Sequence, residues 1–358
     1  ERVSQHPLIT VRTGTTVTAL KGFVGNFTAR LADGAEFQHG VIIVATGAGE
    51  YQPREFRYGV HPRVLTQREL AARLATGAGE AAAPVAGRVV MIQCVGSRNA
   101  EHPYCSRVCC TRAVRNAVRI KERWPDTDVW ILYRDIRTYG LRERDYQRAR
   151  ELGVVFVRFT AERPPEVTGE DRLQVRVVEP LLGQELVVAA DWVVLSTGIV
   201  PDRAGNAALA QLLKVPLNDD GFFLEAHAKL RPVDFATEGI YVAGLAHGAK
   251  SMDESVSQAL AAAARACTVL EKKALTAQSA IAEVWPERCV ACGVCEAICP
   301  YSAIAVEWQP YGRGQRRYAK VTPALCKGCG ACVAGCRSGA LDLAGFTDQQ
   351  VLAEVGEL

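Results

Sequence analysis

The C-terminal part of this chain takes its fold from the stretch Cys289-Val-Ala-Cys292-Gly-Val-Cys295-Glu-Ala-Ile-Cys299-Pro300. Its four cysteines are separated by two, two and three residues. The same spacing returns in Cys326-Lys-Gly-Cys329-Gly-Ala-Cys332-Val-Ala-Gly-Cys336. Three thiolates of such a run bind three irons of one cubane cluster, and the fourth cysteine binds the other cluster. The spacing therefore predicts two [4Fe–4S] clusters, one on Cys289, Cys292, Cys295 and Cys336, and one on Cys326, Cys329, Cys332 and Cys299.

The residues between these cysteines support the same interpretation. Small residues in both runs allow the backbone to wrap around an inorganic core and to donate amides to its sulfurs (Ala291, Gly293, Gly328, Gly330 and Ala331). Structural zinc on paired cysteines is the competing interpretation, but two complete runs of four disfavour it. Arg337 replaces the usual proline after the last cysteine, and residues 307–320 form a longer insertion than a minimal ferredoxin has. We predict a bacterial 2[4Fe–4S] ferredoxin domain over 287–345, followed by a short helical tail over 346–358.

A second group of cysteines lies near the middle of the chain, at Cys94, Cys105, Cys109 and Cys110. Cys94 follows an apolar strand, 89–93, where a dinucleotide site would have a glycine-rich turn. The other three fall at the start of a predicted helix over 106–123, with Cys105 and Cys109 on one face. Three interpretations stay open: a third cluster, a catalytic dithiol, which lacks the usual C-x-x-C spacing, and buried structural cysteines. The remaining Cys267 is expected to be buried on the apolar face of a helix over 254–273, together with Val256, Leu260 and Ala264.

The pattern of strands and helices predicts an α/β fold with one domain inserted in another. Strands are expected at 9–12, 16–22, 26–31 and 41–45, and an alternation of strand and helix over 87–194 is typical of a Rossmann-like parallel sheet. Two strands close in similar turns, Ala45-Thr46-Gly47 and Ser196-Thr197-Gly198. Such a turn is common where backbone passes close to a flavin or nucleotide, although a buried strand and its turn explain it equally well. The similarity of these two turns predicts one domain formed by 1–54 and 195–278 and interrupted by a second domain over 55–194. A linker is predicted over 276–286.

Composition narrows the functional classes. The chain has 358 residues, 49% of them hydrophobic and 23% charged, with a net charge of +3 and no basic tail of the kind that binds nucleic acid. No apolar run reaches the roughly 18 residues of a membrane span. Thirteen cysteines in tight groups suit metal ligation in a reducing cytoplasm better than disulfides. Because Glu1 is not an initiator residue, we expect a processed, split or truncated chain.

Several stretches together resemble the A subunit of heterodisulfide reductase. They are Cys94-Val-Gly-Ser-Arg98, Tyr104-Cys-Ser-Arg-Val-Cys-Cys110, Tyr133-Arg-Asp-Ile-Arg-Thr-Tyr-Gly140, and Gly244-Leu-Ala-His-Gly-Ala-Lys-Ser251 running into Glu254-Ser-Val-Ser-Gln258. The resemblance covers nearly the whole chain. It implies a thioredoxin-reductase-like fold, bound FAD, and a third [4Fe–4S] cluster on Cys94, Cys105, Cys109 and Cys110.

The resemblance also implies a place in a multi-subunit redox complex. The expected partners are B and C subunits of the heterodisulfide-reductase type, hydrogenase, formate or NADH dehydrogenase, and ferredoxin, and the flavin of some members performs electron bifurcation. The family's first FAD motif, G-x-G-x-x-G after an N-terminal strand, is absent here, so another chain or a missing N-terminal half is expected to complete the flavin site. The candidate flavin contacts are Thr46, Gly47, Thr197, Gly198, Gly244, Lys250, Ser251 and Glu254. Lys250 is either a partner for negative charge on reduced flavin or a solvated surface lysine.

Three functions follow from these observations. The first is an electron-transfer, FAD-linked oxidoreductase subunit in which no protein residue acts as acid or base. The second is a self-contained NAD(P)H:acceptor reductase, which the missing glycine fingerprint disfavours. The third is a non-catalytic adaptor that carries clusters in order to dock other subunits.

Overall fold

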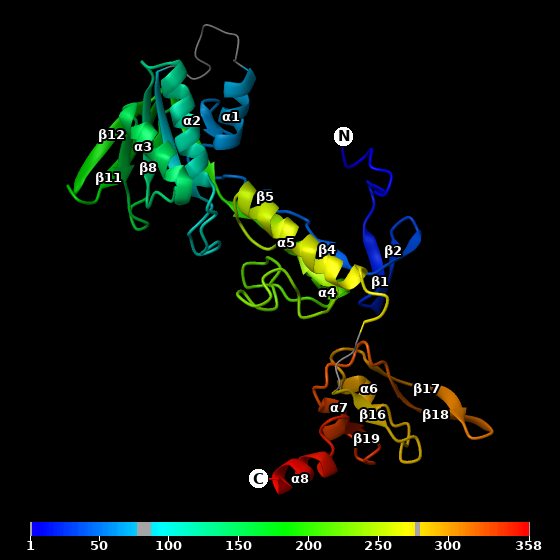
Figure 1. The fold of residues 1–358 in the computed structure, drawn as a ribbon. Coiled ribbons are helices and arrows are strands. Elements are labelled where there is room, and N and C mark those ends of the chain that lie inside the picture. Colours follow the sequence, from blue (N-terminus) through cyan, green and yellow to red (C-terminus); the bar gives the residue numbers. More distant parts are fainter. Residues whose placement is uncertain (1, 77–86, 276–279, 358) are drawn as a thin grey trace. The chain divides into compact units, whose positions relative to one another are not determined.

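The computed structural model describes residues 2–76, 87–275 and 280–357, and the chain divides into two compact units (Figure 1). Unit 1 comprises Glu1–Ile42, Glu238–Ile240 and Ala266–Leu358, and unit 2 comprises Ile43–Thr237 and Tyr241–Arg265. No helix in the described part of the chain is long and apolar enough to span a membrane.

The centre of unit 2 is a five-stranded sheet whose neighbouring strands are all parallel. In spatial order its strands are β6 (Val64–Thr66), β13 (Trp192–Thr197), β7 (Arg88–Val95), β8 (Asp128–Tyr133) and β9 (Val155–Arg158). The parallel α/β sheet predicted from the sequence is therefore confirmed. Strand β6 was not predicted from the sequence, because three buried residues in a row show no alternation.

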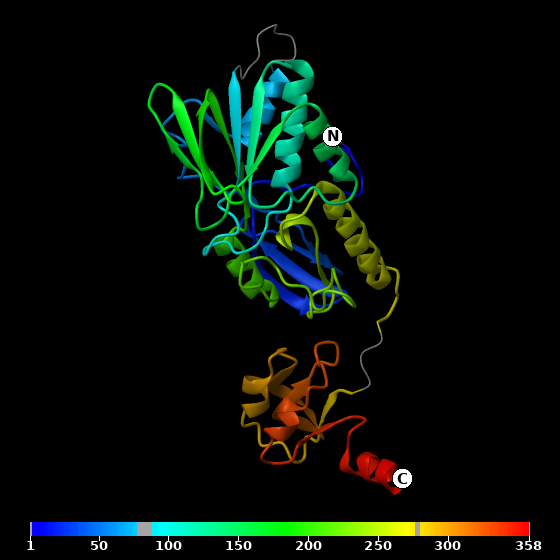
Figure 2. The same ribbon diagram turned by 90° about the vertical axis from the view of Figure 1, so that its left-hand side faces the viewer.

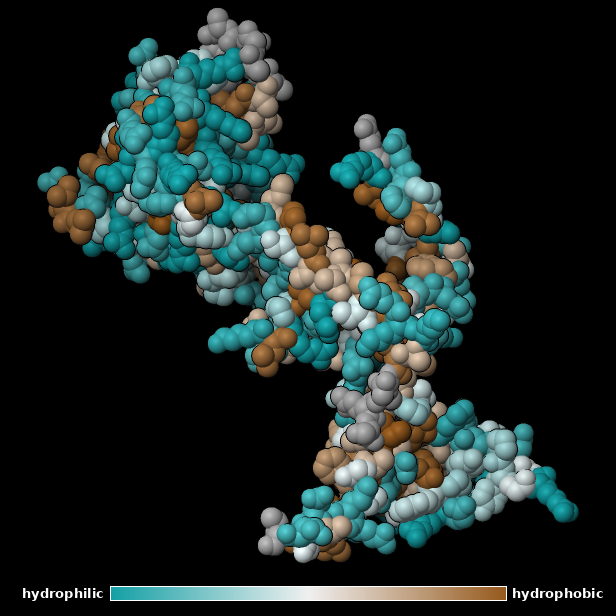
Figure 3. All heavy atoms as spheres, in the orientation of Figure 1, coloured by the Kyte–Doolittle hydropathy of each residue, from teal (hydrophilic) through white to brown (hydrophobic). Residues whose placement is uncertain are grey.

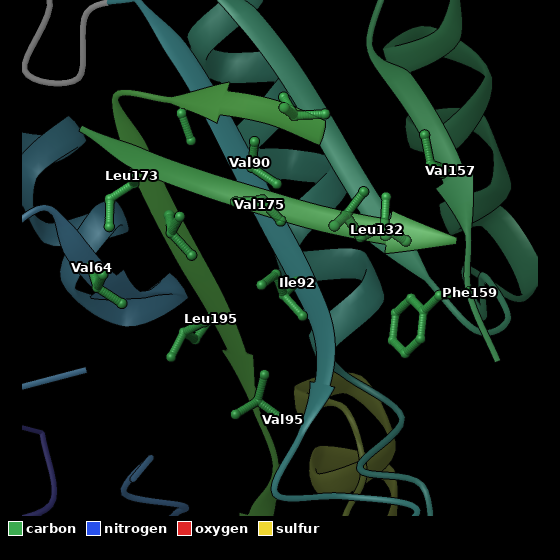
Figure 4. Packing of buried hydrophobic residues seen from close by; sticks show 14 residues of the cluster. Val64, Val90, Ile92, Val95, Leu132, Val157, Phe159, Leu173, Val175 and Leu195 are labelled. Carbon is green, nitrogen blue, oxygen red and sulfur yellow. The ribbon is translucent and has the colours of Figure 1, made fainter. Parts of the chain in front are cut away.

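Two different layers cover the faces of this sheet (Figures 1 and 2). Val89 and Met91 of β7 pack against helices, whereas Val90 and Ile92 pack against a second, antiparallel sheet (Figure 4). This alternation follows from the two-residue period of a strand. The helices are α1 (Gln67–Thr76), α2 (Cys109–Arg123) and α3 (Glu143–Glu151), and the antiparallel strands are β10 (Glu166–Thr168), β11 (Leu173–Glu179) and β12 (Gln184–Ala190).

The chain enters and leaves this layered region through two short strands that pair antiparallel, β5 (Gly49–Glu50) and β14 (Ile199–Val200). Each strand comes directly after one of the two Thr-Gly turns, so the structure brings these turns to the same region of the unit. The elements that follow along the chain are α4 (Arg203–Leu213), β15 (Ile240–Val242), η3 (Gly244–Ala246) and α5 (Met252–Leu270), and the last residues of α5, from Ala266, belong to unit 1.

Helix α5 corrects one prediction. Its buried positions are Ala262 and Ala266, which are four residues apart and share one face. Cys267 follows Ala266 by one residue, which turns it away from the packed face, and it is exposed rather than buried. The apolar stripe that the sequence placed in the core is exposed in this structure, at Val256, Leu260, Ala264 and Cys267. Figure 3 shows hydrophobic surface over this helix, where the side chain of Leu260 is 68% exposed.

Unit 1 begins with an antiparallel sheet of β1 (Val17–Phe23), β2 (Asn26–Leu31) and β3 (Glu36–His39), and β4 (Ile42–Val44) then leads into unit 2. The strand predicted at 9–12 is wrong, since these residues adopt no strand. Ile9 and Val11 are 44% and 53% exposed, so their apolar character does not reflect burial in a sheet.

The cysteine-rich end of the chain folds around two very short helices, α6 (Val294–Ile298) and α7 (Ala331–Ala334). Strands β16 (Ala282–Val284) and β19 (Leu341–Leu343) pair antiparallel, and the insertion forms a hairpin of β17 (Ile304–Tyr311) and β18 (Gly314–Val321). The predicted linker lies partly outside the described residues, at 276–279, and its described part contains β16. The predicted tail helix is present as α8 (Asp348–Gly356), capped by Thr347.

Candidate metal centres and flavin-facing residues

One group of cysteines in the C-terminal module contains residues from both of the four-cysteine runs. Cys326, Cys329 and Cys332 line a small cavity together with Cys299, which comes from the end of the first run. Burial raises the pKa of Cys332 to about 11, and the neighbouring thiols of Cys326, Cys299 and Cys329 act in the same direction. Four thiols that disfavour each other's ionisation are suited to a positively charged inorganic core. The structure thus gathers one of the two ligand sets predicted from spacing.

Three thiols of the other set lie around α6, and Cys336 packs against the same hydrophobic cluster as two of them. Burial raises the pKa of Cys295, and the thiols of Cys289 and Cys292 act in the same direction. Cys336, from the end of the second run, has a lowered pKa. Burial opposes this shift, but the Ser338 hydroxyl and nearby backbone amides stabilise the thiolate.

Backbone amides donate to the sulfurs of three cysteines in this module. The N–H groups of Ala282, Ala303 and Ala340 donate to Cys326, Cys299 and Cys336, with N to Sγ distances of 3.4, 3.3 and 3.2 Å. Such bonds stabilise thiolate ligands and raise the reduction potential of a cluster. The tight winding of the loops requires left-handed residues, and at Gly328, with φ +62°, an added Cβ would lie 2.4 Å from the Ala280 carbonyl oxygen.

The second group of cysteines gathers at the carboxyl end of β7. Cys94 lies there with φ +64°, beside an irregularity in the pairing of β7 with β13. Cys109 and Cys110 are the first residues of α2, and both are buried. The pKa of Cys109 is raised by a hydrogen bond with Cys110 and by burial, and the thiols of Cys94 and Cys105 add to the shift. All four thiols therefore lie close enough to interact.

The start of α2 corrects a second prediction. The helix begins at Cys109, so Cys105 is not a helical residue and does not share a helix face with Cys109. Arg107, with φ +64°, interrupts the right-handed conformation that a helix starting at 106 needs. The turn lets the Arg107 amide donate to the Cys105 sulfur at 3.3 Å. Cys105 thus reaches the group from a loop.

This loop is held by short polar contacts. The Ser106 hydroxyl accepts from the Ile199 amide at 2.8 Å, and the Tyr104 hydroxyl donates to the Ile199 carbonyl at 2.9 Å. The backbone approaches closely at two glycines. A Cβ on Gly96 would lie 2.0 Å from the Tyr51 ring, and one on Gly198 would lie 2.9 Å from the Gly96 carbonyl oxygen. Gly198 therefore has a packing role next to the cysteine loop.

Arginines surround these four cysteines, Cys94, Cys105, Cys109 and Cys110, which are called the Cys94 group below. Arg98 forms a 2.8 Å ion pair with Asp135 and also hydrogen-bonds to the Cys94 thiol. Cys110 has a lowered pKa, chiefly through its hydrogen bond with Cys109 and, against the effect of burial, through Arg137 and Arg98. A cluster ligated by four thiolates is anionic, so this positive environment suits it. The described residues contain no group of three or more His, Cys, Asp or Glu that converges on a single metal ion, and cubane ligands, which bind different irons, need not converge.

The chain is similar to several known proteins. Residues 288–340 match the 4Fe-4S dicluster domain family. The chain is 41% identical over 288 residues to the A subunit of H(2):CoB-CoM heterodisulfide,ferredoxin reductase from Methanothermobacter thermautotrophicus, an alignment covering 76% of this chain and 43% of the relative. It is 43% identical over 276 residues to an A-subunit-like protein of heterodisulfide reductase from Archaeoglobus profundus, covering 76% and 38%. This chain is a relative of the heterodisulfide reductase A subunit.

The resemblance predicted from the sequence is thus confirmed, and the chain spans less than half the length of these A-subunit relatives. Among solved structures, the thioredoxin reductase of T. acidophilum aligns with a TM-score of 0.45 at 15% identity, covering 73% of this chain and 74% of that one. Lactococcus lactis thioredoxin reductase aligns with a TM-score of 0.44 at 20% identity, covering 72% and 75%. The evidence for the α/β fold of this relative of the A subunit is the strand order described above. The evidence for its ferredoxin domain is the family match.

The flavin-facing stretch that the resemblance indicates surrounds a buried amine. Lys250 is only 9% exposed, and its Nζ donates to the Gly244 carbonyl at 2.8 Å and to Gln258 Oε1 at 3.0 Å, with His247 Nδ1 at 2.9 Å. Burial lowers the pKa of Lys250 to about 8, and Arg107 acts in the same direction. Lys250 is therefore not a solvated surface lysine.

The other candidate flavin contacts differ in their surroundings. Glu254 accepts from both the amide and the hydroxyl of Ser251 at 2.8 Å, and it pairs with Arg107. Glu254 thus stabilises the first turn of α5. The Thr197 hydroxyl, at the end of β13, donates to the Glu50 carboxylate of β5. Thr46 is exposed, whereas Gly47 has φ +79° with open space around its Cα, which leaves room for a ligand.

Proposed function

We propose that this chain is an electron-transfer subunit of a heterodisulfide-reductase-type complex and that it holds three [4Fe–4S] clusters. The observation that carries the proposal is the gathering of Cys94, Cys105, Cys109 and Cys110 from a strand end, a loop and a helix start. Two clusters belong to the dicluster domain, and the third would use these four thiolates. Bound clusters supply one-electron transfer, while the protein holds the ligands and sets the potentials.

The residues around the Cys94 group fit a cluster better than the alternatives. Structural cysteines need no cationic surroundings, yet Arg98 and Arg137 both favour the thiolate forms. A catalytic dithiol needs one accessible, reactive thiol. Cys109 and Cys110 are only 6% and 4% exposed, and Cys94 and Cys105 are half-buried, so the group as a whole suits ligation better than a reaction with an external partner.

We extend the proposal to FAD bound with its ring near the start of α5. The buried amine of Lys250 is a cation that fits beside an electron-rich flavin ring, and bound flavin would supply the exchange between two-electron and one-electron chemistry. Because residues 1–47 contain no G-x-G-x-x-G motif, we infer that other polypeptide completes the flavin site. Lys250→Met is expected to lower the potential of reconstituted flavin, measured by spectroelectrochemistry, because a positive charge near reduced flavin is lost.

The remaining parts of the proposal concern the complex. The relatives' names and the resemblance suggest the following partners: B- and C-type subunits, hydrogenase, formate or NADH dehydrogenase, and ferredoxin. We also propose a cytoplasmic location, since none of the thirteen cysteines forms a disulfide and metal ligation by thiolates suits reducing conditions. Bifurcation is a further proposal, tested by whether the assembled complex reduces ferredoxin only when a high-potential acceptor is reduced at the same time.

The decisive experiment measures iron and acid-labile sulfide on anaerobically purified protein, with EPR spectra after dithionite reduction. We expect about twelve irons per chain, four from each of three cubanes. Cys110→Ser is expected to remove about four irons and one EPR signal, whereas Cys267→Ser, at an exposed cysteine outside every ligand set, is expected to leave both unchanged. About eight irons in the unaltered protein would contradict the third cluster.

A further inference from the structure

Unit 2 contains a cavity of about 690 Å³ that the cluster proposal does not use. It lies along α2 and is bounded by Arg68 of α1, by Arg142 of η2 (Gly140–Arg142), and by residues around the start of α5, namely Lys250, Ser251, Met252, Asp253 and Ser255. Its volume falls within the range of cavities that bind cofactors and other small molecules.

The charge of this cavity is one-sided. Seven of its lining residues are cations, and Asp253 is the one acid among the lining residues. Three of the cations, Arg112, Arg115 and Arg119, occupy positions i, i+3 and i+7 of α2 and therefore share one helix face. A wall of guanidinium groups so arranged attracts an anion.

Ion pairs within the described residues account for four of these cations. Arg107 pairs with Glu254, Arg142 with Asp253, Arg115 with Asp145, and Arg68 with Glu50. Arg112 and Arg119 form no ion pair with any described residue. Their guanidinium groups remain available for a ligand.

A second observation points to the same wall of the cavity. Thr111 lies next to Arg112 and is only 7% exposed, yet its hydroxyl Oγ1 has no hydrogen-bond partner among the described residues. A buried hydroxyl without a partner costs about 1–3 kcal/mol, and a bound oxyanion that accepts from it would remove that cost. Thr111 also lines the cavity.

We propose that this cavity binds a diphosphate-bearing ligand of the nucleotide type through Arg112, Arg119 and Thr111. Guanidinium groups match phosphate oxygens in pairs, and two unpaired arginines on one helix face fit a ligand with two adjacent phosphoryl groups. Apolar lining from Val108, Ile199 and Leu245 provides a surface for the rest of a nucleotide.

The site is distinct from the usual dinucleotide position of a Rossmann-like domain. That position lies at the turn between the first strand and its helix, where amides at the helix N-terminus contact a diphosphate. Here the turn is occupied by Cys94, and Cys109 and Cys110 begin the helix. The proposed ligand instead lies along the flank of α2.

The test uses anaerobic, cluster-loaded protein and isothermal titration calorimetry. Inorganic pyrophosphate is the first probe, followed by ADP, NADPH, coenzyme A and FAD. We expect saturable binding that Arg112→Gln and Arg119→Gln each weaken about ten- to a hundredfold, as for other charge-assisted hydrogen bonds. Arg123→Gln is the matched control, because it removes one charge from the same helix outside the cavity, where Arg123 lies 5.1 Å from the Trp124 ring centre.

The outcomes separate the sources of the diphosphate. Displacement of pyrophosphate by FAD identifies the flavin's own diphosphate as the occupant, and binding of NADPH or coenzyme A with FAD in place identifies a separate ligand. Absence of saturable binding by all five probes would overturn the proposal, as would equal weakening by Arg123→Gln. Iron content is measured on each variant and is expected to stay unchanged, so failure here leaves the cluster proposal intact.

Discussion

The potential of a cluster on the Cys94 group should depend on Arg98. Its guanidinium hydrogen-bonds to the Cys94 thiol, and its side chain is only 18% exposed. Replacing it with glutamine removes a positive charge that favours the reduced, more negative cluster. Two unit charges about 5–8 Å apart interact by about 2–3 kcal/mol at an effective dielectric constant of about 20, which corresponds to roughly 90–140 mV for one electron.

Asp135 reduces this effect, because it forms a 2.8 Å ion pair with Arg98 and cancels part of the positive charge. We therefore expect Arg98→Gln to lower the midpoint potential by on the order of 50 mV, and Arg98→Lys to lower it less, since lysine keeps the charge but loses the fork geometry. EPR-monitored redox titration measures the shift, and the two ferredoxin-domain clusters of the same molecule serve as internal references.

Arg158→Gln is the control for this measurement. Arg158 lies 3.9 Å from the same carboxylate, but its side chain is 52% exposed, so solvent screens its charge and only a small shift is expected. An unchanged or raised potential in Arg98→Gln, or an equal shift in Arg158→Gln, would refute the electrostatic reasoning.

Three further predictions follow from the structure. Cys299→Ser should impair the cluster whose other ligands come from the second cysteine run and spare the cluster of the first run, as distinguished by EPR and iron content. Gly96→Ala should lower the free energy of unfolding by about 2–4 kcal/mol and reduce iron content, because its Cβ would overlap the Tyr51 ring and its φ is +67°. The control is Gly153→Ala, at a position with φ +80° and open space. In a denaturant titration it should lower the free energy of unfolding by only about 1 kcal/mol. Because burial lowers the pKa of Lys250 to about 8 from 10.5, the unfolded chain binds more protons between these values, so this group's contribution to stability should rise with pH from about 8 to 10.5. This rise should be absent in Lys250→Met, as denaturant titrations at several pH values would measure.

The parts of the fold that could be predicted depend on local patterns. The runs ending in Cys299 and Cys336 define ligand sets by spacing alone, because a cubane cluster accepts only a narrow range of separations between neighbouring ligands. The core strand β8 (Asp128–Tyr133) lies within the alternation of strand and helix predicted over 87–194, where an apolar run bounded by polar residues is typical of a strand in a parallel sheet. The exact domain limits, the site residues and the number of clusters stay predictions.

Other features could not be predicted because they depend on distant contacts. Cys267 has the local surroundings of a core residue, but which side of α5 is buried depends on what packs against it. The start of α2 depends on Arg107, whose left-handed conformation no local propensity favours. The short strand β6 has too few residues for a period, and it forms because β13 offers its edge for pairing.

By itself, the sequence determined the chemistry: cysteine spacing specifies iron–sulfur ligation because ligand identity and separation are local properties. Only the tertiary structure decided which groups meet. It brought Cys94, Cys105, Cys109 and Cys110 together from a strand end, a loop and a helix, buried the amine of Lys250, and aligned Arg112 and Arg119 along a cavity that no motif marks. The distance in space between the residues that meet is set by how the sheet and its helices pack, and no local stretch of sequence encodes that packing.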